Sequence, residues 1–167
     1  MDILNLLIET GFWAATLRMA TPLIFGTLGE LICERAGVLN LGIEGIMAAG
    51  CMAGWTWVYF GGDLWIGVAF AAFIGALFGL LHSLFTVYLA LSQHVSGLGI
   101  TMLASALSSF AFRMLLPSAT TPPKIIPFKP MHIPILGDIP LIGEIFFNQS
   151  PLTLFAFIAV LFSAWCL

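Results

Sequence analysis

The sequence predicts an all-α, polytopic helical integral membrane protein with about five transmembrane segments. Of its 167 residues, 60% are hydrophobic and 8% are charged, which leaves too little polar surface to cover a water-soluble domain. The mean hydropathy of +1.09 and the 17 glycines are typical of transmembrane helices, in which glycine is commoner than in soluble ones. Several apolar runs also reach the roughly 20 residues that a helix needs to cross a hydrocarbon core of about 30 Å.

Five such runs predict a single transmembrane domain over residues 1–167. The first run, 12–33, follows Asp2 and Glu9 instead of the basic start of a cleaved signal peptide, so it is expected to remain as a helix. The other runs lie at 38–60, 64–91, 95–116 and 152–167. The last run is too short for a complete span, so we expect the chain to be the N-terminal part of a longer protein. The proline-rich segment 117–151 is the only long loop.

The charge balance and the missing motifs exclude several classes of function. Five Lys+Arg against eight Asp+Glu give a net charge of −3, which offers no basic surface for nucleic acid. Neither lysine lies in the glycine-rich loop that cradles nucleotide phosphates, so ATP hydrolysis by this chain is not expected. The three histidines and three cysteines lack ligand spacing, which predicts no metal site, no cofactor and no catalytic residue.

Small residues recur at every fourth position of the predicted helices and indicate close helix packing. In a bilayer no hydrophobic force drives helices together, so such stripes let two backbones approach and gain van der Waals contact. A pore or a sliding interface would use the same pattern, although static packing is the commoner reason for it. The glycines assigned to packing are Gly50, Gly54, Gly67, Gly75, Gly79 and Gly97.

The most informative stretch lies near residues 35–45, where polar residues and glycines interrupt the apolar pattern. An ionisable side chain at membrane depth costs about 2.5 to 3.5 kcal/mol, so it usually faces a cavity or a partner. Glycines allow a helix to break and to expose backbone groups that can bind a solute, as in the discontinuous helices of transporters. We therefore expect a discontinuous region whose residues line a substrate path: Asn40, Gly42, Glu44 and Gly45.

Other interpretations of the polar residues remain open at this point. Asn40 and Glu44 are spaced i, i+4, so in a helix they would share a face and would serve equally well as hydrogen-bonding glue between helices. The charged residues nearer the predicted membrane edge are interpreted as a cytoplasmic, solvated or partner-facing surface. They are Glu30, Glu34 and Arg35.

The same stretch resembles the signature of bacterial ABC importer permeases of the nucleoside and simple-sugar type. The similar residues are Gly29-Glu30 and the run ERAGVLNLGIEG at 34–45. The similarity continues at Gln93 and at 95–98, 101–104, 139–143 and 148–152, so it covers nearly the whole chain. The broader group also holds ribose, galactose and branched-chain amino-acid permeases.

This resemblance implies a plasma-membrane assembly with several partners. A second permease subunit would complete the path, cytoplasmic ATP-binding subunits would drive it, and an extracytoplasmic solute-binding protein or lipoprotein would deliver the solute. It also implies that Glu34-Arg35 and Gln93-His94 are cytoplasmic, that 117–151 is extracytoplasmic, and that the path-lining residues are those named above. The alternative is a truncated or degenerate paralogue with a structural or regulatory role, because the basic stretch that docks on the ATPase in this family lies outside these 167 residues.

Overall fold

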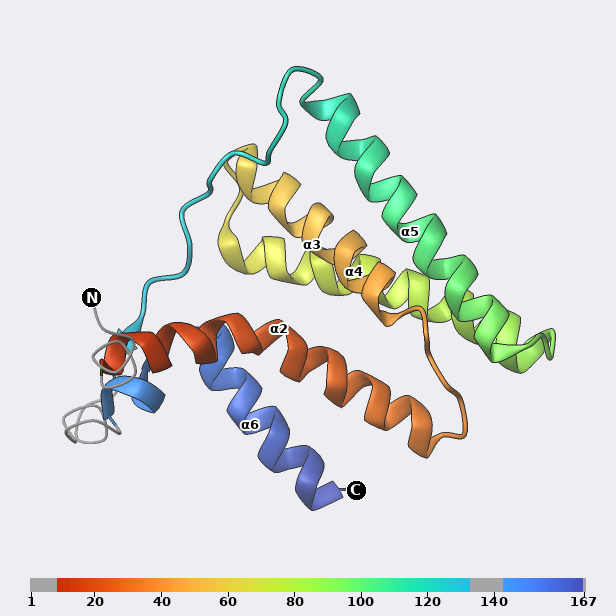
Figure 1. Ribbon diagram of the computed structural model, residues 1–167, viewed down its shortest axis with the longest axis horizontal. Helices are drawn as coiled ribbons and strands as arrows, with labels where there is room; N and C mark the ends of the chain where they lie inside the picture. The colour runs from red at the N-terminus through yellow and green to blue at the C-terminus, as the bar shows by residue number, and fades with distance from the viewer. Residues whose placement is uncertain (1–8, 133–142, 167) are drawn as a thin grey trace. The chain divides into compact units, whose positions relative to one another are not determined.

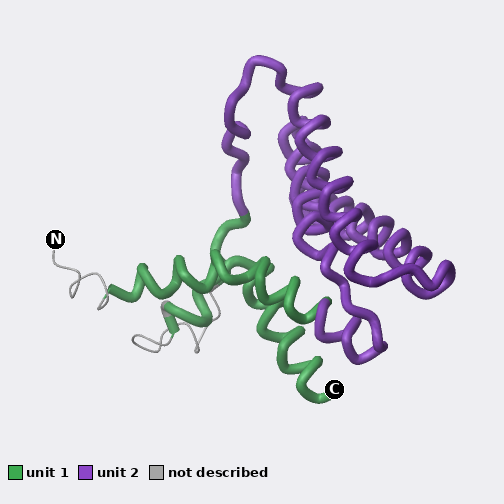
Figure 2. The backbone as a smooth tube through the Cα atoms, turned by 45° about the vertical axis from the view of Figure 1, so that its right-hand side comes forward, with its two compact units in different colours: residues 1–29, 128–167 green, residues 30–127 purple. Residues whose placement is uncertain are grey.

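The computed structural model describes residues 9–132 and 143–166. The described part of the chain is largely helical and falls into two compact units, residues 1–29 with 128–167 and residues 30–127 (Figure 2). The long helices are α2 (Thr10–Arg35), α3 (Ile43–Tyr59), α4 (Leu64–Ser83), α5 (Gln93–Leu115) and α6 (Pro151–Cys166). The short elements are the π-helical turns η1 (Leu84–Tyr88) and η2 (Gly143–Phe147) and the strands β1 (Met131–His132) and β2 (Asn148–Gln149), which pair antiparallel.

The helices follow the five apolar runs, with one informative difference. The second run was expected to be helical from residue 38, but α3 begins only at Ile43, because residues 36–42 form the expected discontinuity. Within the described residues, two helices are long and apolar enough to cross a membrane, Leu64–Tyr88 and Gln93–Leu115, and Pro151–Cys166 is a shorter apolar helix. That all five helices span a bilayer stays a prediction.

Helices α3, α4 and α5 lie alongside one another, and α3 contacts both of the others (Figure 1). Glycines bring α3 and α4 close together: a Cβ built on Gly54 would lie 2.9 Å from the Gly67 carbonyl oxygen, and one on Gly50 would lie 3.2 Å from that of Ala71. Side chains at these positions would push the two backbones apart. The small-residue stripes of the second and third runs therefore face each other here.

The stripe of α4 is not in close contact along its whole length. A Cβ on Gly75 would meet Ile46 Cγ2 at 3.8 Å, which is ordinary van der Waals contact. A Cβ on Gly79 would meet no described atom within 4 Å. In the part of the chain that the structure describes, Gly79 thus has no close packing neighbour, whereas Gly67 does.

The turn between α3 and α4 shows why α4 begins where it does. Gly61 has a φ of +88°, a conformation that glycine adopts without steric cost. Asp63 then caps α4, because its carboxylate accepts hydrogen bonds from the backbone N–H groups of Trp65 and Ile66 at 2.8 and 3.3 Å. The cap satisfies donors that the first helical turn leaves unpaired.

Polar and aromatic contacts hold α2 to α6 and to β2 within the other compact unit. The hydroxyls of Thr21 and Thr153 lie 2.9 Å apart, and both residues are buried. The Gln149 side-chain amide donates to the Ala14 carbonyl at 3.1 Å, and the rings of Phe25 and Phe155 have centroids 6.2 Å apart. Hydrogen bonds between helices of this kind are typical of packing in lipid.

Candidate functional site: the interrupted segment between α2 and α3

The interrupted segment, residues 36–42, begins with a glycine turn that ends α2. Gly37 has a φ of +83°, its N–H donates to the Glu34 carbonyl at 2.9 Å, and the Val38 N–H donates to the Cys33 carbonyl at 3.0 Å. This pair of bonds is the Schellman arrangement, in which a left-handed glycine closes a helix. The chain then runs without helical bonds until α3 starts at Ile43.

Two side chains hold the peptide group that joins Leu39 to Asn40. The Glu30 Oε1 atom accepts a hydrogen bond from the Asn40 N–H at 2.9 Å. On the other side of the same peptide, His82 Nε2 lies 3.2 Å from the Leu39 carbonyl oxygen, and it must be the donor because a carbonyl only accepts. His82 is 3% exposed and Leu39 is 38% exposed, so this bond is partly buried.

Helix α5 holds the rest of the segment. The Gln93 side chain accepts from the Leu39 N–H at 2.9 Å and donates to the Gly37 carbonyl at 3.3 Å. The Thr101 hydroxyl is 3.1 Å from the Leu41 carbonyl, to which it donates. Unpaired backbone groups are too costly inside a bilayer, and irregular backbone occurs there only where protein or a water-filled cavity satisfies it.

Close packing against α5 depends on three of the glycines singled out in the sequence. A Cβ on Gly45 would lie 2.5 Å from Thr101 Cα, and one on Gly97 would lie 2.8 Å from Leu41 Cβ. At Gly42 it would lie 3.1 Å from the Ile100 side chain. A larger residue at Gly45 or Gly97 would require the backbone to move, and one at Gly42 would require neighbouring side chains to shift, so the segment and α5 are matched in shape.

The structure separates Asn40 from Glu44. Asn40 is buried, and its Oδ1 accepts from the Gly42 N–H at 3.1 Å in a local turn. Because Asn40 lies outside the helix, the shared face expected from the i, i+4 spacing does not form. Glu44 is exposed in the first turn of α3 and makes no hydrogen bond or ion pair with the described residues.

Glu44 of α3 lies beside the middle part of α5, away from the ends of that helix. Its neighbour Gly45 packs on Thr101, which is eight residues from the start of α5 at Gln93. At 1.5 Å per residue this is about 12 Å along a membrane-length helix. An exposed carboxylate at such a depth is expected to face water, solute or a partner, not lipid.

The three residues expected on a solvated or partner-facing surface differ in their surroundings. Glu34 and Arg35 are exposed at the end of α2, and their contact with a partner stays a prediction. Glu30 instead turns toward the interrupted segment, and its Oε2 atom is buried without a hydrogen-bond partner among the described residues. Glu30 is thus partly buried and bound to a backbone N–H, and its place on a cytoplasmic or partner-facing surface stays a prediction.

Sequence reasoning overlooked the anchoring roles of His82, Gln93 and Thr101. His82 stands as one polar residue within a long apolar run, which is itself a signal that it must find a partner in the protein. The sequence gives Gln93 and Thr101 only as part of the family resemblance, which does not identify them as anchors of the segment. Within the described residues there is no group of three His, Cys, Asp or Glu side chains that would hold a metal ion.

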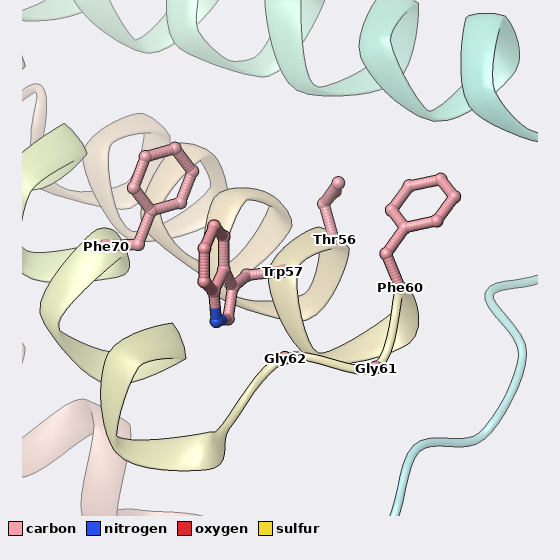
Figure 3. A pocket seen from close by; sticks show the side chains of 6 residues that line it. All are labelled: Thr56, Trp57, Phe60, Gly61, Gly62 and Phe70. Atoms are coloured by element: carbon pink, nitrogen blue, oxygen red, sulfur yellow. The ribbon is translucent and has the colours of Figure 1, made fainter.

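A separate hollow beside the Gly61-Gly62 turn has an aromatic lining. Its volume is about 430 Å³, and Trp57 of α3 and Phe70 of α4 lie beside it with ring centroids 6.1 Å apart (Figure 3). Thr56 and Phe60 complete the lining, which includes no charged group. Aromatic side chains gather in this way at the surfaces of a bilayer.

Comparison with known proteins gives one family and several relatives. The family described as the permease component of branched-chain amino acid transport systems matches residues 12–167. The chain is 37% identical to the guanosine ABC transporter permease protein NupQ of Bacillus subtilis, over 99% of this chain and 53% of the relative. It is 36% identical to the nucleoside ABC transporter permease protein NupC of Lactococcus lactis, over 87% of this chain and 48% of that protein.

A third relative is named for a sugar. The chain is 35% identical to the putative glucose ABC transporter permease protein TsgC13 of Haloferax volcanii, over 90% of this chain and 45% of the relative. The chain thus spans about half the length of the curated relatives that it matches. No solved structure was found to match it.

Proposed function

Because this chain belongs to the family of permease components of branched-chain amino acid transport systems, we propose that it forms part of the permease of an ATP-driven ABC importer for nucleosides or simple sugars. The relatives named for guanosine, nucleosides and glucose support this range of solutes. Substrate selection, partners and transport are properties that we propose for the whole protein, of which the chain spans part.

One observation supports a role for the interrupted segment in the translocation path. Its backbone is non-helical next to α5, yet described side chains from α2, α4 and α5 bind its peptide groups. Such a break is stable in a bilayer only where protein or water satisfies it. Beside it, the exposed Glu44 carboxylate has no described partner. We propose that Glu44 contacts solute directly, that Gly42 and Gly45 permit the close packing, and that Asn40 supports the local turn.

The proposed importer needs components that this chain does not supply. A second permease subunit would complete the path in the bacterial plasma membrane, and separate cytoplasmic ATP-binding subunits would hydrolyse ATP. An extracytoplasmic solute-binding protein or lipoprotein would deliver the solute to the side of the 117–151 loop. In this orientation Glu34 and Arg35 would lie on the cytoplasmic side.

Uptake by the full-length permease with its partner subunits tests the proposal. Cells carrying the complete importer are expected to accumulate radiolabelled guanosine, cytidine or ribose above cells that lack it. Glu44→Ala is expected to lower uptake about tenfold or more, because a hydrogen bond to a charged group contributes roughly 1.5 to 3 kcal/mol.

The control is Glu9→Ala, which removes an exposed carboxylate before α2. It should leave uptake unchanged, and the amount of permease in the membrane should be equal in all strains. Normal uptake by the Glu44→Ala variant would assign Glu44 to packing or surface charge. Failure of the wild-type importer to accumulate any of the three solutes would overturn the proposed substrate range.

A further inference from the structure

A polar hollow lies between the C-terminal half of α5, the neighbouring part of α3 and the loop that follows α5. Its volume is about 780 Å³, within the range of about 300 to 1,000 Å³ that is usual for small-molecule sites. The lining combines one cation, three hydroxyls, an aromatic ring and a thioether: Arg113, Ser108, Ser109, Thr120, Phe112 and Met52. Two prolines and one alanine of the loop complete it, Pro117, Pro122 and Ala119.

This hollow differs chemically from two others among the described residues. The hollow beside the Gly61-Gly62 turn has an aromatic lining with one hydroxyl. A third, beside η1, is lined mainly by leucine, isoleucine, valine and phenylalanine side chains with two serines. Neither of these linings contains a charged residue, so of these three hollows the one at Arg113 offers a charged hydrogen-bond donor.

Three of the four polar side chains of the hollow, Arg113, Ser109 and Thr120, make no side-chain hydrogen bond with the described residues. The guanidinium of Arg113 is exposed and makes no hydrogen bond or ion pair with the described residues. Ser109 is likewise exposed, and the Ser108 hydroxyl donates to the Ala104 carbonyl at 2.7 Å, which leaves its oxygen lone pairs free to accept. Thr120 is exposed on the facing loop.

A hydrogen bond from α3 holds the loop that lines one side of the hollow. The indole N–H of Trp55 donates to the Pro123 carbonyl at 3.1 Å. The Trp55 ring stacks on Tyr59 with centroids 4.9 Å apart and lies 6.1 Å from the ring of Phe112. The aromatic group therefore connects α3, α5 and the loop around the hollow.

Resting on the function proposed above, we propose that this hollow is a nucleoside-binding station at the loop end of the path. A nucleoside carries a flat heterocycle with paired acceptors and a sugar with several hydroxyls. The guanidinium presents donors in a planar fork that suits paired acceptors, and an aromatic ring offers a face for stacking. The serine and threonine hydroxyls complement the sugar.

The position of the station along α5 fits a path that includes the interrupted segment. Arg113 is twelve residues beyond Thr101, which contacts the interrupted segment. Along an α-helix this spacing is about 18 Å. A nucleoside bound at Arg113 is thus on α5 but separate from Glu44, and it would move along the helix to reach the carboxylate.

Transport kinetics of the full-length importer in cells provide the first test, with guanosine as the solute. Arg113→Gln is expected to raise the KM for guanosine about tenfold, equivalent to about 1.4 kcal/mol, with a smaller effect on maximal rate. Lys124→Gln removes the same charge from an exposed site outside the hollow and should leave KM unchanged. An unchanged KM in Arg113→Gln would overturn the station while leaving the importer function intact.

Thiol labelling provides a second test that does not depend on transport. In a full-length permease whose other cysteines are replaced, Ser109→Cys should react with a polar maleimide, and saturating guanosine should slow the reaction about tenfold. Ala106→Cys, exposed on α5 outside the hollow, should show no protection. Equal labelling of Ser109→Cys with and without guanosine would overturn the proposal, and protection by ribose but not by cytidine would replace the nucleoside with a sugar.

Discussion

Glu30 and His82 bind opposite edges of one peptide group, although they come from different helices. Glu30 Oε1 accepts from the Asn40 N–H at 2.9 Å, and His82 Nε2 donates to the Leu39 carbonyl at 3.2 Å. In a trans peptide these two backbone groups point in opposite directions, so the two side chains approach from opposite sides. The peptide is therefore oriented by α2 and α4 together.

The hydrogen bond of His82 can be tested with a substitution that keeps an aromatic ring but removes its N–H donor. His82→Phe leaves the Leu39 carbonyl without its donor, and we expect it to destabilise the full-length permease by about 1 kcal/mol. Thermal unfolding in detergent would show a lower Tm. His94→Phe, at an exposed position, serves as the control. Equal Tm values for the wild type and His82→Phe would contradict this role.

His82 and Gln93 should be energetically coupled, because both bind Leu39. Gln93→Leu removes the acceptor of the Leu39 N–H and the donor to the Gly37 carbonyl. If one of the two side chains is removed, the segment is already loosened, and removal of the second costs less. The double variant should therefore be more stable, by about 0.5 to 3 kcal/mol, than the summed losses of the two single variants predict. Unfolding of both single variants and the double variant measures the coupling.

The matching control combines Gln93→Leu with Asp63→Ala at the N-terminus of α4. These two sites share no described contact, so their effects should add within about 0.5 kcal/mol. Strict additivity in the His82 pair as well would show that the two anchors act independently.

Gly45 and Gly79 provide a contrast between a filled and an open position. Gly45→Ala places a methyl group 2.5 Å from Thr101 Cα, and we expect a loss of at least about 1 to 3 kcal/mol and reduced uptake. Gly79→Ala meets no described atom within 4 Å and should be neutral or stabilise α4 by up to about 1 kcal/mol. Tm values of both variants give the comparison, and similar losses at both positions would count against the described packing.

The N-cap of α4 predicts a small and chemically specific effect. Asp63→Ala removes the acceptor for the Trp65 and Ile66 N–H groups and should cost about 1 kcal/mol. Asp63→Asn retains a capping oxygen and should stay within a few tenths of a kcal/mol of the wild type. Chemical or thermal unfolding of the two variants distinguishes a cap from a surface charge.

Hydropathy and glycine spacing predicted the helices and the break, but not the contacts inside it. A membrane-spanning helix needs an apolar run of a certain length, and the sequence shows that length directly. Gly37 and Gly42 mark positions where a helix can end. The partner of a polar side chain depends on which helices meet, and this is a tertiary property. The sequence therefore does not show that Glu30 binds a backbone N–H or that Asn40 is buried in a local turn, while their roles in the path and toward a partner stay predictions.

Residues 37–41 are hydrogen-bonded to three helices, and this affects how those helices can move relative to one another. If α4 slides relative to α2, the Leu39–Asn40 peptide cannot follow both Glu30 and His82, so one bond must be released before another forms. Rearrangement at this junction would then occur in discrete steps and not as a gradual drift. A displacement that begins in one helix would in this way be converted into an all-or-none change in the backbone next to Glu44.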